Sequence, residues 1–237
     1  MLHFQQKLPD FNPVVAGGRA SVRVPKGPTY REFVLGYTPD GTKANKATMI
    51  ADIEEVVLKI NGIAKRTYSG EDLVMINSFY MGKNGQDGFT DGELVVPLSP
   101  PWARTMEGEE NLCWGTRDID NLFIDVKLAS GATNPQLSCE AFFTPDSRDL
   151  GLIVEVHKVQ VSSSVAGKIE ISDLAKENGS LVALHMKSAD ITACELWAVN
   201  HQVQQKPVQQ PFKQMNVLQQ QITRMYAHSR LRDQIIN

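Results

Sequence analysis

Hydrophobic and polar positions alternate along much of the first half of the chain, which is typical of strands with one buried face. In residues 19–24 the apolar side chains stand at 20, 22 and 24, and in residues 122–128 they stand at 122, 124, 126 and 128. Another alternating run, 56–60, leads into Asn61-Gly62 and returns over 63–68. Because both turn residues accept positive φ, this order predicts a tight β-hairpin. The same pattern predicts further strands over 32–37, 93–98, 137–143, 151–161, 168–172, 181–186 and 191–199.

One of these predicted strands changes phase part-way along. The first two valines of the run over 151–161 share one face, and its last two valines fall on the opposite face. An extra residue near His157-Lys158 would bring all four onto a common face. The pattern therefore predicts a β-bulge at this point.

The clearest helix signal of the first half follows the predicted hairpin. Ser69 precedes Asp72 by three residues, which is the spacing of a capping box. Apolar side chains at 73, 76 and 80 then share one stripe, so a short helix is predicted near 70–80. Its place between strands suits a lid over the open end of a barrel-like sandwich. Many short strands separated by turns rich in proline and glycine indicate an all-β sandwich or jelly roll rather than an α/β sheet.

The length of 237 residues allows one large β-domain or two smaller ones. Proline, aspartate and serine concentrate over 144–150, which is the best position for a domain boundary. Nine of the twenty residues from Gln202 to Gln221 are glutamine. This stretch is either flexible and of low complexity or a loop rich in amides along a partner surface. Apolar residues in 217–237 have helical spacing, so their propensity predicts a helix.

Composition narrows the function classes. Twenty-four basic and 27 acidic residues give a net charge of −3, without the basic stripe expected of a nucleic-acid-binding protein. Three cysteines, Cys113, Cys139 and Cys194, are too few and too far apart for a disulfide framework and are expected to be buried, reduced thiols. No apolar run is long enough to span a bilayer, and residues 1–11 lack the apolar stretch of an export signal. We therefore expect a reducing, cytosol-like compartment.

Candidate catalytic residues are sparse. The five histidines, at 3, 157, 185, 201 and 228, contain no pair at metal-ligand spacing. Residues 162–168 end in Gly-Lys but begin with serine, so a phosphate-binding loop is not expected. The carboxylates Glu107, Glu109 and Glu110 lie near Trp102 and Trp114, an arrangement that a glycosidase could use but that a solvated loop explains better. We expect no catalytic residue and no enzyme activity.

A metal or cofactor site is equally weakly indicated. Asp87, Asp91 and Glu93 lie in a glycine-rich loop and could offer oxygen atoms to calcium, although their spacing departs from the EF-hand pattern. A polar turn is the favoured interpretation. No cofactor and no metal ligand is assigned, and a structural calcium ion is left open.

The order of features resembles the N-terminal domain of the major capsid protein of corticovirus-like phages, which are tailless icosahedral viruses with an internal membrane. The succession of strand, Asn-Gly turn, strand and short helix is the most specific part of the resemblance. The segments that carry it are Phe4–Phe11, Ala20–Val24, Tyr30–Tyr37, Val57–Gly62, the return to Thr67, Ser69–Tyr80, Gly167–Leu174, Leu181–Ile191 and Glu195–Trp197.

This resemblance implies a double jelly roll: an N-terminal arm over 1–18, a first jelly roll over 19–147 and a second over 148–237. It implies a structural coat protein whose homotrimers form pseudo-hexameric capsomers of an icosahedral shell over a membrane. The implied partners are neighbouring capsomers and the minor capsid and membrane proteins of the virion, with no nucleic-acid specificity. The second jelly roll has room for only five or six strands, so it is expected to be truncated or diverged, and 217–237 is a strand or a helix. Family members can bind calcium, but no motif here assigns the ligands.

Two other functions compete with this interpretation. A carbohydrate-binding β-sandwich of a phage spike or lectin would use exposed aromatic side chains, with Trp102, Trp114 or Trp197 as its platform. A hydrolase built on the same sandwich would depend on the carboxylates at 107–110.

Overall fold

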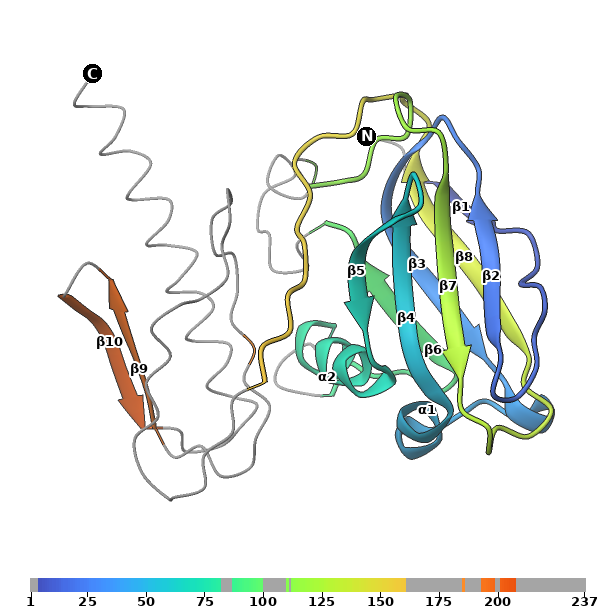
Figure 1. The fold of residues 1–237 in the computed structure, drawn as a ribbon, viewed down its shortest axis with the longest axis horizontal. Coiled ribbons are helices and arrows are strands. Elements are labelled where there is room, and N and C mark those ends of the chain that lie inside the picture. The colour runs from blue at the N-terminus through green and yellow to red at the C-terminus, as the bar shows by residue number, and fades with distance from the viewer. Residues whose placement is uncertain are drawn as a thin grey trace. The chain divides into compact units, whose positions relative to one another are not determined.

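The computed structural model describes residues 4–81, 87–99, 110, 112–160, 185, 193–198 and 201–207. The chain forms two compact units, residues 1–161 and residues 162–237. The first unit contains most of the described elements (Figure 1).

Two antiparallel four-stranded sheets form the first unit (Figure 1). One sheet has the order β1-β8-β3-β6 and the other the order β2-β7-β4-β5. Apart from the β4–β5 hairpin, the chain crosses to the opposite sheet after each strand, and this is the strand order of a jelly roll. The strands are β1 (Phe4–Lys7), β2 (Arg19–Val24), β3 (Thr29–Tyr37), β4 (Ile53–Ile60), β5 (Ile63–Tyr68), β6 (Glu93–Pro97), β7 (Leu122–Leu128) and β8 (Leu137–Thr144). The predicted class, mostly β with antiparallel sheets, is confirmed.

The register of the sheets places the alternating apolar side chains in one core. Val22 of β2 lies opposite Ile124 of β7, which in turn lies opposite Leu58 of β4. All three side chains are buried. Burying each one contributes about 1.5–3 kcal/mol of hydrophobic free energy. A slip of one residue would turn the whole apolar set to the outer face, so the alternation fixes the register.

The Asn61-Gly62 hairpin forms as predicted. Both residues have positive φ, 50° and 80°, as a two-residue hairpin turn requires. The side-chain oxygen of Asn61 also accepts hydrogen bonds from the backbone N–H groups of Asp120 and Asn121, at 2.8 and 3.1 Å. The turn therefore also holds the residues that lead into β7.

Two helices lie at the end of the β4–β5 hairpin opposite its turn (Figure 1). Helix α1 (Lys46–Asp52) precedes β4, and helix α2 (Gly70–Tyr80) follows β5. The capping box of α2 is confirmed, because Ser69 and Asp72 exchange hydrogen bonds between side chain and backbone. Gly70 fits where α2 meets the end of α1, since an added Cβ would stand 2.5 Å from the carbonyl oxygen of Ile53.

Several elements differ from the prediction. Strand β1, helix α1 and a short 3-10 helix, Pro39–Gly41, were not expected. Residues 151–160 form no strand, so the strand predicted over 151–161 and its bulge at His157-Lys158 are wrong. Ile153 and Val156 are half-buried against the core, although the segment joins no sheet. The side chains of this segment that pack against the core are three residues apart, so they lie along the side of the sandwich without the period of two that a strand would show.

The second unit contains an antiparallel pair, β9 (Ala193–Ala198) and β10 (His201–Pro207). Strand β9 confirms the strand predicted over 191–199. Strand β10 occupies the start of the glutamine-rich stretch, which was expected to be flexible or a loop, and its register shifts between Gln202 and Gln204. The predictions over 168–172 and 217–237 lie outside the described residues. Of 181–186 only His185 is described, and it lies in no strand.

Candidate assembly surfaces

The N-terminal segment is part of the sandwich. Strand β1 pairs with β8 at one edge of its sheet, and all four of its residues are exposed. Phe4, 44% exposed, stacks on Phe143 with ring centroids 6.1 Å apart. Leu8 and Phe11, which follow, are buried in the core. The first residues thus divide into an exposed edge strand and a buried anchor.

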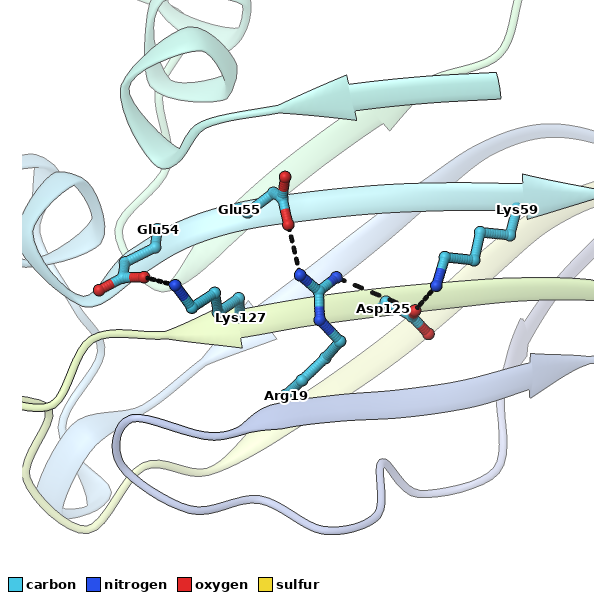
Figure 2. Close-up of polar contacts among 6 residues, drawn as sticks. All are labelled: Arg19, Glu54, Glu55, Lys59, Asp125 and Lys127. Carbon is cyan, nitrogen blue, oxygen red and sulfur yellow. Dashed lines mark hydrogen bonds and ion pairs between the residues drawn. The ribbon is translucent and has the colours of Figure 1, made fainter. Parts of the chain in front are cut away.

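The outer face of the β2-β7-β4-β5 sheet carries a network of ion pairs (Figure 2). Asp125 of β7 receives a hydrogen bond from the Ser21 hydroxyl at 2.7 Å and pairs with Lys59 of β4 at 2.6 Å. Arg19 of β2 lies between Glu55 of β4, at 2.6 Å, and Asp125, at 4.0 Å. Although Asp125 points away from the core, these neighbours leave its side chain only 8% exposed.

A separate pair, Lys127 with Glu54 at 2.6 Å, lies farther along the same face (Figure 2). The two groups of contacts join β2, β7 and β4 across their outer side. Cross-strand pairs of opposite charge stabilise the register in which they meet. This face is therefore polar and internally neutralised.

Arg66 closes the side of the sandwich between β5 and β6. It extends from the inward face of β5 and is only 3% exposed. Its guanidinium donates to the carbonyl oxygens of Pro97 and, at 3.1 Å, Leu98, which end the opposite sheet. It also lies over the ring of Trp114, 5.0 Å from the centroid. Burial lowers the pKa of Arg66, while Tyr68 acts in the opposite direction.

The third acceptor of Arg66 comes from residues 150–160. Arg66 Nε donates to the carbonyl oxygen of Val154 at 2.7 Å. Nearby, Lys65 pairs with Glu155 at 2.8 Å, and this hydrogen bond lowers the pKa of the Glu155 carboxyl. Lys158 pairs with Asp72 at 2.7 Å. Burial opposes the ionisation of Asp72, but the hydrogen bonds from Lys158 and Ser69 outweigh it, so its pKa is lowered.

Of the three carboxylates suggested for catalysis, the structure describes only Glu110. Glu110 pairs with Arg148 at 3.5 Å, and Glu107, Glu109 and Trp102 lie outside the described residues, as does the Gly-Lys loop over 162–168. Trp114 is completely buried, so it cannot be the platform of a sugar-binding site. His157 is exposed and lies 3.7 Å from Glu155, outside any strand.

The acidic loop considered for calcium is neutralised by lysines. Asp87 pairs with Lys46, which lowers the pKa of the carboxyl, and Glu93 pairs with Lys43 at 3.5 Å. Among the described residues, no three side chains of the metal-binding types form a group that could hold an ion. A structural calcium ion receives no ligand set from this part of the chain.

The thiols and the helices add two further facts. Cys113 and Cys139 are buried, as expected, and burial raises the pKa of Cys139 to about 12, which keeps it protonated at neutral pH. Within the described ranges, no helix is both long and apolar enough to cross a membrane.

Comparison with known families identifies the first unit. Residues 5–144 match the family described as the viral coat protein P2 N-terminal domain. The match covers more than half of the chain and spans the jelly roll from β1 to β8. The chain belongs to this family of viral coat proteins. The predicted resemblance is therefore confirmed.

The chain also matches solved structures of capsid proteins. The major capsid protein P2 of bacteriophage PM2 is 20% identical, with a TM-score of 0.51, and the match covers 64% of this chain and 52% of P2. The PBCV-1 virus capsid is 12% identical (60% of this chain, 41% of that one, TM-score 0.38), and the STIV MCP is 11% identical (62% and 49%, TM-score 0.38). This coat protein thus spans about half the length of the PM2 protein. No curated protein matches it.

Neither Arg66 nor Asp125 stood out in the sequence of this coat protein. Arg66 could have been noticed because it is a charged residue two positions before Tyr68, so both side chains are on the inward face of β5. Asp125 occupies an outward position, where a charge is ordinary. Its burial depends on side chains from two other strands, which no local pattern reveals.

Proposed function

We propose that this chain is a structural coat protein that assembles with copies of itself into a viral shell. The observation that carries the proposal is the jelly-roll strand order over the residues that match the coat protein family. A jelly roll presents two sheet faces and short edges to its neighbours, which suits repeated packing. The proposed role is structural and involves no turnover of a substrate.

The finer assembly is part of the same proposal. Three copies form a trimer in which six similar jelly rolls surround one axis, giving a pseudo-hexameric capsomer. This arrangement needs a second jelly roll in each chain, for which we propose the part of 148–237 that follows residues 150–160, since those residues pack on the first unit. The first jelly roll then contains 19–147 together with β1, Leu8 and Phe11 from the expected arm over 1–18. The partners are neighbouring capsomers and the minor capsid and membrane proteins of a virion with an internal membrane. The chain is made in the host cytoplasm.

Solution mass tests this proposal directly. We expect light scattering behind a sizing column to give about three times the chain mass of 26.3 kDa. The measurement is repeated with calcium and, as a control for general cation effects, with magnesium. A calcium-specific change would add a structural ion to the proposal. A monomer over the full concentration range would contradict the trimer.

The N-terminal arm needs a separate test, for which the structure sets the boundary. We propose that residues 1–7 contact a neighbouring capsomer or the membrane side of the shell. Removing 1–7 deletes β1, which has no buried residue, and leaves Leu8 and Phe11 for the core. A deletion of 1–16 would remove this anchor too and would confuse folding with assembly. If the 1–7 deletion assembles as well as the parent chain, the arm has no such role.

A further inference from the structure

Residues 150–160, here called the strap, lie along the first unit without joining a sheet. Leu150, Ile153 and Val156 are partly buried against the core. Between and beyond them, Leu152 is 69% exposed and Val159 is 56% exposed. The strap therefore contacts the unit along one side only.

The strap follows an edge that would otherwise be open. Strand β5 is the last strand of the β2-β7-β4-β5 sheet and is hydrogen-bonded to β4 on one side. In the part of the chain that the structure describes, no strand pairs with its other side, and the strap runs beside it (Figure 1). An unpaired edge strand is a template for pairing with another chain, and proteins commonly cover such edges. Ile63, at the start of β5, is 62% exposed and adds an apolar side chain to this edge.

Three side chains fasten the strap at successive points. Arg66 of β5 donates a hydrogen bond to the carbonyl oxygen of Val154, and this contact is partly buried. The pairs Lys65–Glu155 and Lys158–Asp72 are closer to solvent, with side chains 27% and 37%, and 50% and 19%, exposed. Salt shortens the range of electrostatic attraction from about 8 Å at 0.15 M to about 3 Å at 1 M. The far end of the strap, after residue 154, is therefore the part that loosens first.

We propose that the strap is a detachable cover of the β5 edge, and that its release allows this edge to pair with the β5 edge of a second copy. The choice of a second copy rests on the proposed function, since a coat protein assembles with itself. Two β5 edges are related by the symmetry of a two-fold contact, in which the same surface is used on both sides. While fastened, the strap holds this contact back.

Limited trypsin digestion tests the fastening, because Lys158 is a cleavage site within the strap. We expect E155Q, which removes the partner of Lys65, to speed the cut after Lys158 by about two- to five-fold, the effect of losing one exposed ion pair. E54Q is the matched control, since it breaks the exposed pair with Lys127 on the same sheet and should leave this cut unchanged. Raised salt should speed the cut in the parent chain more than in E155Q. Rates that agree among the parent, E155Q and E54Q would overturn the fastening.

Self-association of the intact chain tests the proposed pairing of β5 edges between two copies. We expect the double variant E155Q/K158Q to show a higher average mass by light scattering than the parent at the same concentration. Adding I63K, which places a charge on the exposed edge, should return the mass to that of the parent. An unchanged mass in the double variant, or an increase that I63K does not reverse, would overturn the pairing of β5 edges. Because each comparison is made against the parent, the result does not depend on whether the parent is a trimer.

Discussion

Asp125 shows how an outward-facing residue becomes structurally important. Its carboxylate is nearly covered and is shared by Ser21, Lys59 and Arg19. We expect Asp125→Asn to lower the free energy of unfolding by about 1–3 kcal/mol, because Lys59 would keep its charge beside a neutral amide. Urea denaturation at neutral pH and low salt measures the change.

The matched control for Asp125 lies on the same sheet. Glu54→Gln removes a carboxylate from an exposed pair, whose contribution is at most about 1 kcal/mol. The loss from Asp125→Asn should also persist in 1 M salt, since a covered pair is poorly screened. Equal effects of the two substitutions would show that the network adds nothing beyond ordinary surface charge.

Arg66, in contrast to Asp125, points inward from its strand, and its substitution gives a second prediction. Its three carbonyl acceptors need the fork of a guanidinium, which a lysine ammonium cannot reproduce. Arg66→Lys should therefore cost about 2–4 kcal/mol although the charge is kept, because buried carbonyl groups lose their donors. Arg19→Lys, at an exposed position, is the control and should cost at most about 1 kcal/mol. Thermal unfolding of both variants decides the case, and similar losses would refute a special role for Arg66.

At the scale of elements, the contribution of the α2 N-terminus to the stability of the protein depends on pH. The lowered pKa of Asp72 means that the unfolded state takes up a proton more readily, so stability rises with pH across the interval between the two pKa values. The contribution is complete above the ordinary aspartate pKa of about 3.9 and is lost as the pH falls through the folded value. We expect Asp72→Asn to be less stable than the parent at pH 7, and the gap to close as the pH is lowered below about 4.

Urea denaturation of both chains from pH 7 to pH 3 measures that gap. Ser69→Ala is a useful companion, because it removes the other half of the capping box and should cost about 1 kcal/mol at neutral pH. A difference between the parent and Asp72→Asn that stays constant with pH would exclude ionisation of Asp72 as the cause.

Elements with a local signal could be predicted from the sequence, and those held by distant contacts could not. Strands β2 and β7, the Asn61-Gly62 turn and the cap of α2 each follow from residues close together in the chain. Strand β1 has no buried residue, so it carries no alternation. Helix α1 has a single buried residue, Met49, and thus no apolar stripe. The strap alternates like a strand, but its hydrogen bond to Arg66 and its place beside β5 depend on residues far away in sequence.

At the scale of the whole molecule, the edges of the two sheets are treated differently. The β6 edge is bound by α2, whose Asn77 side chain both donates to and accepts from the backbone of Val95. The β2 edge is bridged by Asn12, which exchanges backbone hydrogen bonds with Ser21. The β5 edge has the strap beside it. Strand β1 is the remaining edge, and its residues are exposed along their whole length. Among the described residues of the first unit, the edges best suited to the proposed contact with other copies are thus the one at β1 and the one that the strap covers.

The first unit contains a complete jelly roll together with its strap, so we expect the fragment 1–161 to fold without the rest of the chain. Its core contains side chains from both four-stranded sheets, and all of these strands lie within the first unit. The fragment should unfold in a single cooperative transition, followed by circular dichroism and by tryptophan fluorescence, with Trp114 reporting from the core.

The fragment 1–149 is the control: it lacks the strap, so Leu150, Ile153 and Val156 no longer cover the core and Arg66 loses one acceptor. It should be less stable by several kcal/mol, since each lost half-buried side chain costs about 1 kcal/mol and the lost hydrogen bond about 1–3 kcal/mol. If 1–161 is unfolded by itself, the second unit is required for the first to fold; if the two fragments are equally stable, the strap contributes nothing to the jelly roll.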